Sequence, residues 1–138
     1  MRQKQTREEE ANAITHFLKT IAKLRHPEEG CPWDLEQNHR SLQTYVIEEA
    51  YELVEAIDSG NDEKIKNELG DVLLQVALHS QIAEERNAFN FSDVAQTINE
   101  KMLRRHPHVF GSSDKITCLL YTSPSPRDRT RPRMPSSA

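Results

Sequence analysis

Two acidic stretches carry the side chains of this sequence that are best suited to chemistry. They are Glu48-Glu49-Ala50-Tyr51-Glu52 and, sixteen residues later, Glu68-Leu69-Gly70-Asp71. Both lie within apolar patterns that have the period of a helix, in which residues three and four apart share one face. Carboxylates crowded at the edge of an apolar face repel one another, so either their pKa values rise or a cation neutralises them. The two stretches are therefore candidates for the two halves of one metal site.

The two stretches repeat one pattern at a shift of nineteen residues, which places Glu49 on Glu68 and Glu52 on Asp71. In both, the acidic pair lies on the shoulder of an apolar stripe. A very short connection near Gly60 makes the two helices antiparallel neighbours, so packing of the stripes brings the four carboxylates toward one region. Oxygen ligands without His or Cys at matching positions select a hard ion, Mg²⁺ or Mn²⁺.

Two other interpretations compete with this metal site. Acidic residues at helical spacing most often form a solvated face, and that explanation suffices for Glu55, Glu63, Glu84 and Glu85. The doubled pattern with apolar flanks argues for the metal, and the residue pattern alone leaves both interpretations open. A di-iron site requires Glu-x-x-His from two helices, whereas this sequence has that spacing only at Glu36 and His39, in a loop. His79 is interpreted as a satisfied histidine or an interface residue.

The elements that must position these acids are helices, and the fold class is all-α. The helical period predicts four helices, with expected limits of Thr6 to about His26, Ser41 or Thr44 to Ser59, Asn61 or Asp62 to about Arg86, and Ser92 to His106. A capping box at Thr6 and Glu9 predicts the first start, and Gly60 caps the second helix. Residues 27–40 are expected to form a loop because two prolines and a glycine interrupt it. In the last helix we expect Val94, Ile98 and Met102 to face inward.

Composition divides the chain into one helical domain, 1–111, and a tail, 112–138. The tail is rich in proline and serine and cannot bury enough surface to offset its ordering entropy, so we expect it to be disordered. Its abrupt change of character near residue 115 suggests sequence that is not native to the protein. Residues 1–111 carry 13 Lys and Arg against 20 Asp and Glu. This acidic balance argues against binding of nucleic acid.

Neither a membrane span nor a signal peptide is visible in the sequence. No apolar run approaches the roughly 18 residues that cross a bilayer. The first ten residues are polar and charged and are not followed by an apolar segment. A cytoplasmic protein without a membrane partner is therefore the expectation.

Three further residues are candidates for contact with a ligand. Trp33, in the expected loop, is either a plug that closes the helix bundle or a platform for an aromatic ligand. Lys101 and Arg105 belong to a basic cluster at the end of the last helix, where cations also compensate the helix dipole. On an acidic domain, such a cluster suits a phosphate chain held by Mg²⁺.

These blocks together resemble a known family. The Glu-Glu-x-x-Glu of 48–52 followed by the Glu-x-x-Asp of 68–71 resembles the signature of the MazG nucleoside triphosphate pyrophosphohydrolases, in the all-α NTP pyrophosphatase superfamily. The agreement extends to Gly30-Cys31-Pro32-Trp33-Asp34 and to the block from Arg104 to Phe110. It covers about residues 12–111 and is greatest with the first domain of members that carry two domains in tandem.

The resemblance implies Mg²⁺-dependent hydrolysis of a nucleoside triphosphate to the monophosphate and pyrophosphate. The implied metal ligands are Glu49, Glu52, Glu68 and Asp71. Water attacks the α-phosphorus, and Glu48 or Glu52 orients it or takes its proton. Trp33 then lines the nucleotide pocket, and Lys101 and Arg105 contact phosphate. The family also implies a homodimer or a higher oligomer.

Two alternatives remain open at this point. The first is a narrower enzyme of the same superfamily, such as a dUTP or dCTP pyrophosphatase or a phosphoribosyl-ATP pyrophosphatase. The second is a catalytically weak module that a metal stabilises and that serves dimerisation or partner binding. Hydrolysis assays with a panel of nucleotides distinguish the first alternative from the MazG resemblance, which broad acceptance of nucleotides would favour. Thermal stability that Mg²⁺ raises, without hydrolysis of any nucleotide, would support the second alternative.

Overall fold

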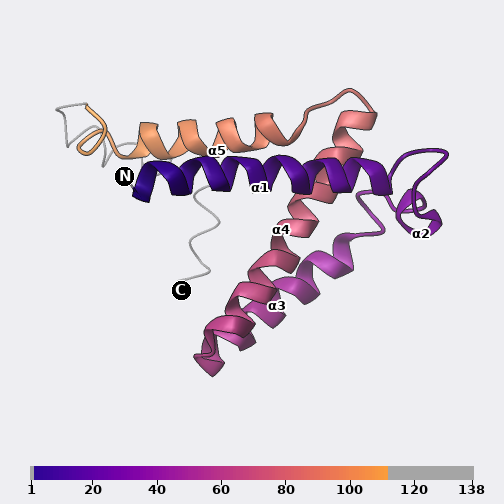
Figure 1. Cartoon of the computed structure of the whole chain (residues 1–138), viewed down its shortest axis with the longest axis horizontal. Helices are drawn as coiled ribbons and strands as arrows, with labels where there is room; N and C mark the ends of the chain where they lie inside the picture. The colour runs from indigo at the N-terminus through magenta and orange to yellow at the C-terminus, as the bar shows by residue number, and fades with distance from the viewer. Residues whose placement is uncertain (1, 112–138) are drawn as a thin grey trace. The chain divides into compact units, whose positions relative to one another are not determined.

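The structure, a computed structural model, describes residues 2–111 of the 138-residue chain. Within that range the chain contains no strand, which confirms the all-α class. Its helices are α1 (Arg2–Leu24), α2 (Pro32–Leu35), α3 (Gln43–Ser59), α4 (Asp62–Glu85) and α5 (Phe91–Arg105) (Figure 1). The chain divides after Phe91 into two compact units. The expected disorder and the non-native character of 112–138 lie outside the described residues.

Helices α3 and α4 form the antiparallel pair that the short connection predicts (Figure 1). Gly60 ends α3 in the left-handed conformation, with φ of 72°, and its N–H donates to the Ile57 carbonyl at 3.1 Å. Asn61 caps the start of α4, because its side-chain oxygen accepts a hydrogen bond from the Lys64 N–H. Both features follow the common capping chemistry of helix ends. Two residues thus reverse the chain and set the acidic stretches side by side.

The structure corrects the expected start of the first helix. Helix α1 begins at Arg2, so the Thr6 and Glu9 spacing lies inside the helix and is not a capping box at its start. Arg, Gln and Lys before Thr6 are good helix formers and extend the helix toward the N-terminus. The helix ends at Leu24, close to the expected limit.

Two other expectations also differ from the structure. The segment 27–40 is not entirely loop, because Pro32–Leu35 forms α2 with Pro32 at a first-turn position. Proline is tolerated there, since its missing N–H would have no helical partner in any case. Helix α5 begins at Phe91, one residue before the expected cap.

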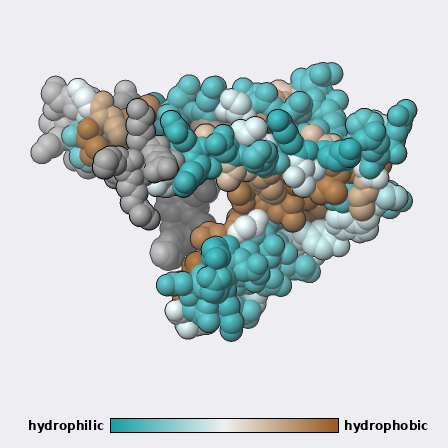
Figure 2. Space-filling view, in the orientation of Figure 1, coloured by the Kyte–Doolittle hydropathy of each residue, from teal (hydrophilic) through white to brown (hydrophobic). Residues whose placement is uncertain are grey.

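A small core lies where α1 crosses the C-terminal half of α4. Ile21 of α1 and Leu42 before α3 are almost fully buried, against Ala77, Leu78 and Ile82 of α4. The small Ala77 side chain lets the two helices approach closely. Helices α3 and α4 leave many apolar side chains exposed, and Figure 2 shows this apolar surface in brown below α1.

The second unit is described by α5 and the residues after it, up to 111. Val94 is half-buried, but Ile98 and Met102 are exposed in the single chain. The expectation that all three face inward is therefore wrong for Ile98 and Met102. Within the described part of this unit, α5 is the sole helix, so no second helix of the unit covers these side chains.

Candidate metal centre

Four carboxylates converge where α3 and α4 run side by side. Glu49 and Glu52 of α3 and Glu68 and Asp71 of α4 each place one oxygen within 4.8 Å of the others. Each helix contributes a pair three residues apart, so both side chains of a pair project from the same face. The antiparallel pairing then sets the two acidic faces against one another. The structure thus brings together the residues that the sequence names as metal ligands.

Burial makes this cluster costly without a cation. Glu49, Glu68 and Asp71 are partly buried, while Glu52 is exposed. One carboxylate oxygen of Glu49 and one of Glu68 are fully buried, and neither has a hydrogen-bond partner among the described residues. A buried acceptor that has lost water and gained no donor is destabilising. The two oxygens fit a bound metal ion, because a cation supplies the missing partner for both.

The same crowding perturbs the acidity of two members of the cluster. Burial, followed by the charges of Glu52, Asp71 and Glu48, raises the pKa of Glu49 above its ordinary range. Burial, followed by the charges of Glu52, Asp71 and Glu49, raises the pKa of Glu68. Burial and the repulsion between neighbouring carboxylates shift both groups toward their neutral forms. A divalent cation held here favours the ionised forms instead.

This crowding predicts a pH dependence in protein freed of divalent metal. Because folding raises the pKa of Glu68, the contribution of this group to stability is complete below its unfolded-state pKa and is lost as pH rises through the folded-state value. Glu68→Gln removes that loss. We therefore expect the variant and the wild type to have similar stability in acid, with the variant more stable toward neutral pH. Urea unfolding at several pH values with a chelator measures the difference, and a difference that is constant with pH contradicts the expectation.

A cavity of about 280 Å³ adjoins the cluster. One of the side chains that line it is a lysine that the sequence did not single out. Glu52 and Glu68 line the cavity together with Lys64, from the first turn of α4. Lys64 lies four residues before Glu68, so the helical period places both on one face, and this spacing was the available signal. Glu55 also lines the cavity, so the solvated-face interpretation is incomplete for that residue.

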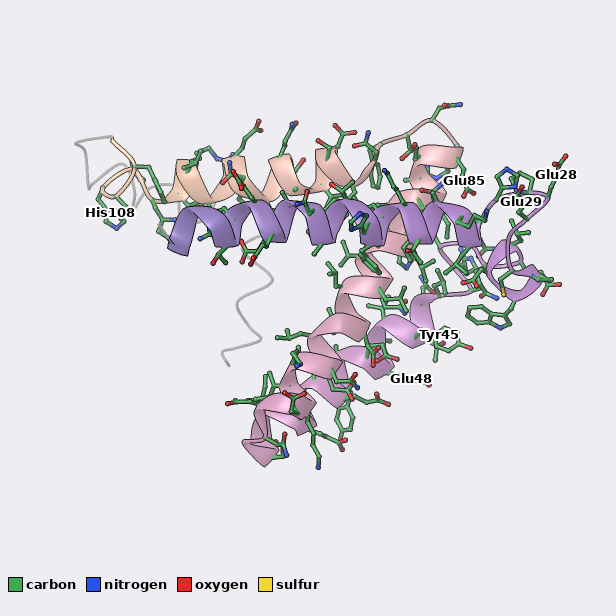
Figure 3. The ribbon with its side chains drawn as sticks, in the orientation of Figure 1. Glu28, Glu29, Tyr45, Glu48, Glu85 and His108 are labelled. Carbon is green, nitrogen blue, oxygen red and sulfur yellow. The ribbon has the colours of Figure 1, made fainter. Side chains whose placement is uncertain are left out.

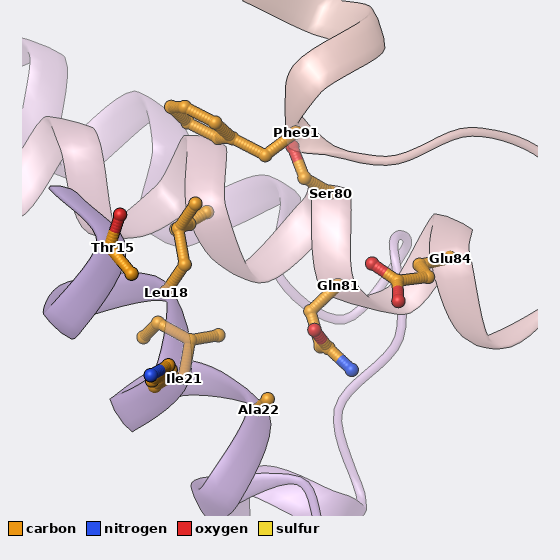
Figure 4. Close-up of a pocket in the computed structure, with 10 residues that line it drawn as sticks. Thr15, Leu18, Ile21, Ala22, Ser80, Gln81, Glu84 and Phe91 are labelled. Atoms are coloured by element: carbon orange, nitrogen blue, oxygen red, sulfur yellow. The ribbon is translucent and has the colours of Figure 1, made fainter. Parts of the chain in front are cut away.

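A second cavity, of about 290 Å³, lies between α1 and α4 (Figure 4). Its lining includes apolar side chains, among them Leu18 and Ile21 of α1 and Ala77 of α4. It also includes polar side chains, among them Lys19 and Glu84. None of the four acids lines it, so this cavity is separate from the candidate metal centre.

The remaining predicted site residues lie in three places. Glu48 is exposed on α3 and outside the four-acid cluster, although its charge contributes to the raised pKa of Glu49. Trp33 is 48% exposed, which rules out a buried plug. Lys101 and Arg105 lie one turn apart on α5, in the second unit, and their contact with a substrate stays a prediction.

Trp33 has an aromatic partner on the helix that carries the first acidic pair. Its ring meets Tyr45 edge to face, with centroids 5.9 Å apart and planes at 79°. Tyr45 lies one helical turn before Glu48 and Glu49, and Figure 3 labels Tyr45 and Glu48 on this part of α3. The half-exposed aromatic pair therefore lies beside the start of the acidic stretch.

His79 is held by a contact that the sequence did not indicate. Its ring stacks on that of His39 with planes 4° apart, and the two Nδ1 atoms are 2.8 Å apart. His39 Nε2 accepts a hydrogen bond from Arg86 Nε at 3.3 Å. Burial, followed by the charge of His39, lowers the pKa of His79. The contact fixes the segment before α3 to the end of α4.

Taken together, the fold and the site define an all-helical protein whose candidate centre consists of carboxylates on an antiparallel helix pair. The model of the MazG nucleotide pyrophosphohydrolase domain matches residues 37–110, which include all four acids. This match spans more than half of the chain. The chain belongs to the MazG nucleotide pyrophosphohydrolase family.

Several curated bacterial proteins are similar to this chain. The nucleoside triphosphate pyrophosphohydrolase/pyrophosphatase MazG of Thermotoga maritima is 65% identical over 97 residues, which cover 70% of this chain and 38% of that protein. The nucleoside triphosphate pyrophosphohydrolase of Escherichia coli K12 is 43% identical over 102 residues, covering 74% and 39%. The uncharacterized protein YabN of Bacillus subtilis is 56% identical over 94 residues, covering 68% and 19%. The chain thus spans less than two fifths of the length of these relatives.

No helix in the described range, 2–111, is both long and apolar enough to cross a membrane.

Proposed function

We propose that this chain hydrolyses nucleoside triphosphates to the monophosphate and pyrophosphate at the four-carboxylate centre. The observation that carries the proposal is the convergence of four carboxylates from two helices, with two buried oxygens that lack a hydrogen-bond partner in the described chain. Family membership supports the reaction class, and two of the relatives are named for this activity. Glu49, Glu52, Glu68 and Asp71 would hold the metal, which we propose is Mg²⁺, with Mn²⁺ as a substitute.

Bound there, the metal would neutralise the charge of the triphosphate and lower the pKa of a water molecule. The attacking water forms a bond to the α-phosphorus, and the bond from that phosphorus to the bridging oxygen breaks, which releases pyrophosphate. Glu52, the exposed member of the cluster, borders the cavity and is our candidate to take the proton of the water. Glu48 is the second candidate for this proton, because it is exposed and close enough to influence Glu49.

Other side chains would bind the nucleotide. Lys64 borders the cavity beside Glu52 and Glu68, so its ammonium can pair with phosphate oxygens. Trp33 and Tyr45 offer half-exposed aromatic surface on which a nucleobase can stack. Lys101 and Arg105 are further candidates for phosphate contact. In this arrangement the nucleobase contacts Trp33 and Tyr45, and the phosphates lie beside the four carboxylates.

The reaction is tested by incubating the full chain with a panel of eight nucleoside triphosphates and Mg²⁺. We expect pyrophosphate and the corresponding monophosphate from several of them. Turnover of dUTP or dCTP alone would favour a narrower enzyme. Release of orthophosphate in place of pyrophosphate would contradict the proposal.

Lys64→Gln is expected to raise KM by roughly tenfold or more, because a charge-assisted hydrogen bond to phosphate is lost. Lys66→Gln is the matched control. Lys66 lies two residues further along the same helix and makes an exposed ion pair with Glu63 at 3.1 Å, which contributes little. Steady-state kinetics of both variants measures the effect, and an equal KM in the two variants would remove Lys64 from the site.

Assembly as a homodimer or higher oligomer is part of the proposal. It is supported by apolar side chains that the single chain leaves exposed on α3 and α4, namely Val46, Ile47, Val54, Ile57 and Leu69. Exposed apolar surface of this extent marks an interaction site. Light scattering measures the molar mass, and a monomer at micromolar concentration would contradict assembly. A cytoplasmic location also belongs to the proposal, with which the free cysteine Cys31 agrees.

A metal-stabilised module for dimerisation is the second candidate function. The apolar side chains that the single chain leaves exposed on α3 and α4 favour it. Stabilisation by Mg²⁺ without hydrolysis of any nucleotide in the panel would support this candidate over the first.

A further inference from the structure

Arg25 is a buried cation that the proposed reaction does not use. It follows the last residue of α1 and is 9% exposed. A buried guanidinium is destabilising unless its donors are satisfied, so its partners identify what it holds in place.

The partners of Arg25 come from two separate parts of the chain. Its Nε and Nη2 donate to the two carboxylate oxygens of Glu85, at the end of α4, each at 2.8 Å. Its Nη1 donates to the backbone carbonyl of Asp34, and to that of Gln37 at 3.1 Å. The hydrogen bonds from Arg25 are the first cause of the lowered pKa of Glu85. One side chain thus ties the ends of α1 and α4 to the α2 segment.

The α2 segment held in this way is the one that carries Trp33. Asp34 is the next residue, and the side-chain amide of Gln37 donates to the Trp33 carbonyl at 3.0 Å. The backbone of Trp33 is therefore flanked by two groups that Arg25 fixes directly. The ring of Trp33 reaches Tyr45 of α3, one turn before the acidic stretch.

In the connection between α1 and α2, the backbone at Gly30 lies very close to the backbone at the end of α1. The N–H of Gly30 donates to the His26 carbonyl at 2.8 Å, and that of Cys31 donates to the Leu24 carbonyl at 2.9 Å. A Cβ at Gly30 would collide with the carbonyl oxygens of Leu24 and His26. The connection therefore folds back on the end of α1, which sets the α2 segment within reach of Arg25.

We propose that Arg25 is a positioning residue for the nucleotide site, because it holds the α2 segment so that Trp33 stays against Tyr45 beside the acidic cluster. The role of the aromatic pair in nucleotide binding rests on the proposed function. The guanidinium is suited to this task, since its planar donors engage a carboxylate and two carbonyls at once, which a lysine ammonium cannot reproduce. Loss of this arrangement should loosen Trp33 and weaken binding while leaving the acidic cluster intact.

Two variants and one control test the proposal in the full chain. Arg25→Lys keeps the charge and loses the fork of donors, and Glu85→Gln removes the anionic partner. Lys23→Gln is the control, because it breaks a neighbouring ion pair with Glu29, at 2.7 Å, in which both side chains are exposed and which contributes little to holding the chain in place. Circular dichroism checks folding. Trp33 is the single tryptophan of the sequence, so its fluorescence reports this segment alone.

We expect Arg25→Lys to shift the emission of Trp33 to the red and to increase its quenching by acrylamide, both measured without nucleotide. With ATP and Mg²⁺ we expect KM to rise by about tenfold, the scale of one lost base–aromatic stack, with kcat nearly unchanged. Glu85→Gln should shift the same readouts in the same direction, and Lys23→Gln should leave them at wild-type values.

Unchanged emission and quenching in a folded Arg25→Lys would overturn the proposal, and so would a fall in kcat with KM unchanged. If Arg25→Lys does not fold, Glu85→Gln decides by the same criteria. Absence of turnover in the wild type would count against the proposed function only, since the fluorescence measurements still decide whether Arg25 positions Trp33.

Discussion

Glu49→Gln and Asp71→Asn are each expected to lower the rate of pyrophosphate release by about a thousandfold or more, because each removes a charged ligand from the proposed metal centre. The two residues lie on different helices, yet their carboxylate oxygens converge within 4.8 Å. Loss of either should therefore have a similar effect. Initial rates at saturating Mg²⁺ and nucleotide measure it, with circular dichroism to show that the helices persist.

Glu63→Gln is the matched control for this pair of variants. It makes the same chemical change on α4, but the Glu63 side chain is 81% exposed and lies outside the four-acid cluster. We expect its rate to stay within about twofold of the wild type, since exposed charges contribute little. A wild-type rate in Glu49→Gln or Asp71→Asn would remove the metal assignment.

Mg²⁺ added to chelator-treated wild-type protein is expected to raise the midpoint of thermal unfolding by roughly 10 °C at a concentration about a hundredfold above its dissociation constant. The metal binds the folded state, in which the carboxylates are gathered, and relieves the repulsion that raises the pKa of Glu49 and Glu68. Calorimetry with and without Mg²⁺ measures the shift.

The same experiment on Glu49→Gln should change both the unfolding midpoint without metal and the response to Mg²⁺. Without metal, we expect the variant to unfold at a higher temperature than the wild type, because one buried and crowded negative charge is gone. With Mg²⁺, we expect most of the upward shift to be lost. An equal Mg²⁺ response in the variant and the wild type would show that Glu49 is not a ligand of the metal.

The part of the site formed by α3 and α4 could be predicted because its determinants are local. The spacing of three residues within each acidic pair fixes their shared face, and the capping residues Gly60 and Asn61 fix the reversal between the helices. Together they place the four acids opposite one another without any knowledge of distant contacts. Lys64 could have been found by the same period, since it lies one turn before Glu68.

The connection between α1 and α3 could not be predicted because its determinants are distant in sequence. Arg25 and Glu85 are 60 residues apart, and nothing in the local pattern distinguishes Glu85 from its neighbour Glu84. The structure shows Glu85 exposed but paired with the buried Arg25, so the interpretation of Glu85 as part of a solvated face is incomplete.

The local sequence pattern also failed to predict where α2 and α1 begin, for physical reasons. In the sequence Pro32 indicates an interruption, but a proline is compatible with the first turn of a helix and here starts α2. The Thr6 and Glu9 spacing marks a helix start only if the residues before it are not helical. Those residues favour helix, and α1 begins at Arg2.

We expect this chain to direct water to the α-phosphorus of a nucleoside triphosphate at a metal centre of four carboxylates. Turnover in water enriched with ¹⁸O, followed by mass spectrometry of the products, identifies the phosphorus that the water attacks. We expect one ¹⁸O atom in the nucleoside monophosphate, none in the pyrophosphate, and no reaction in the presence of a chelator. Label in the pyrophosphate, or turnover that persists without divalent metal, would contradict this expectation.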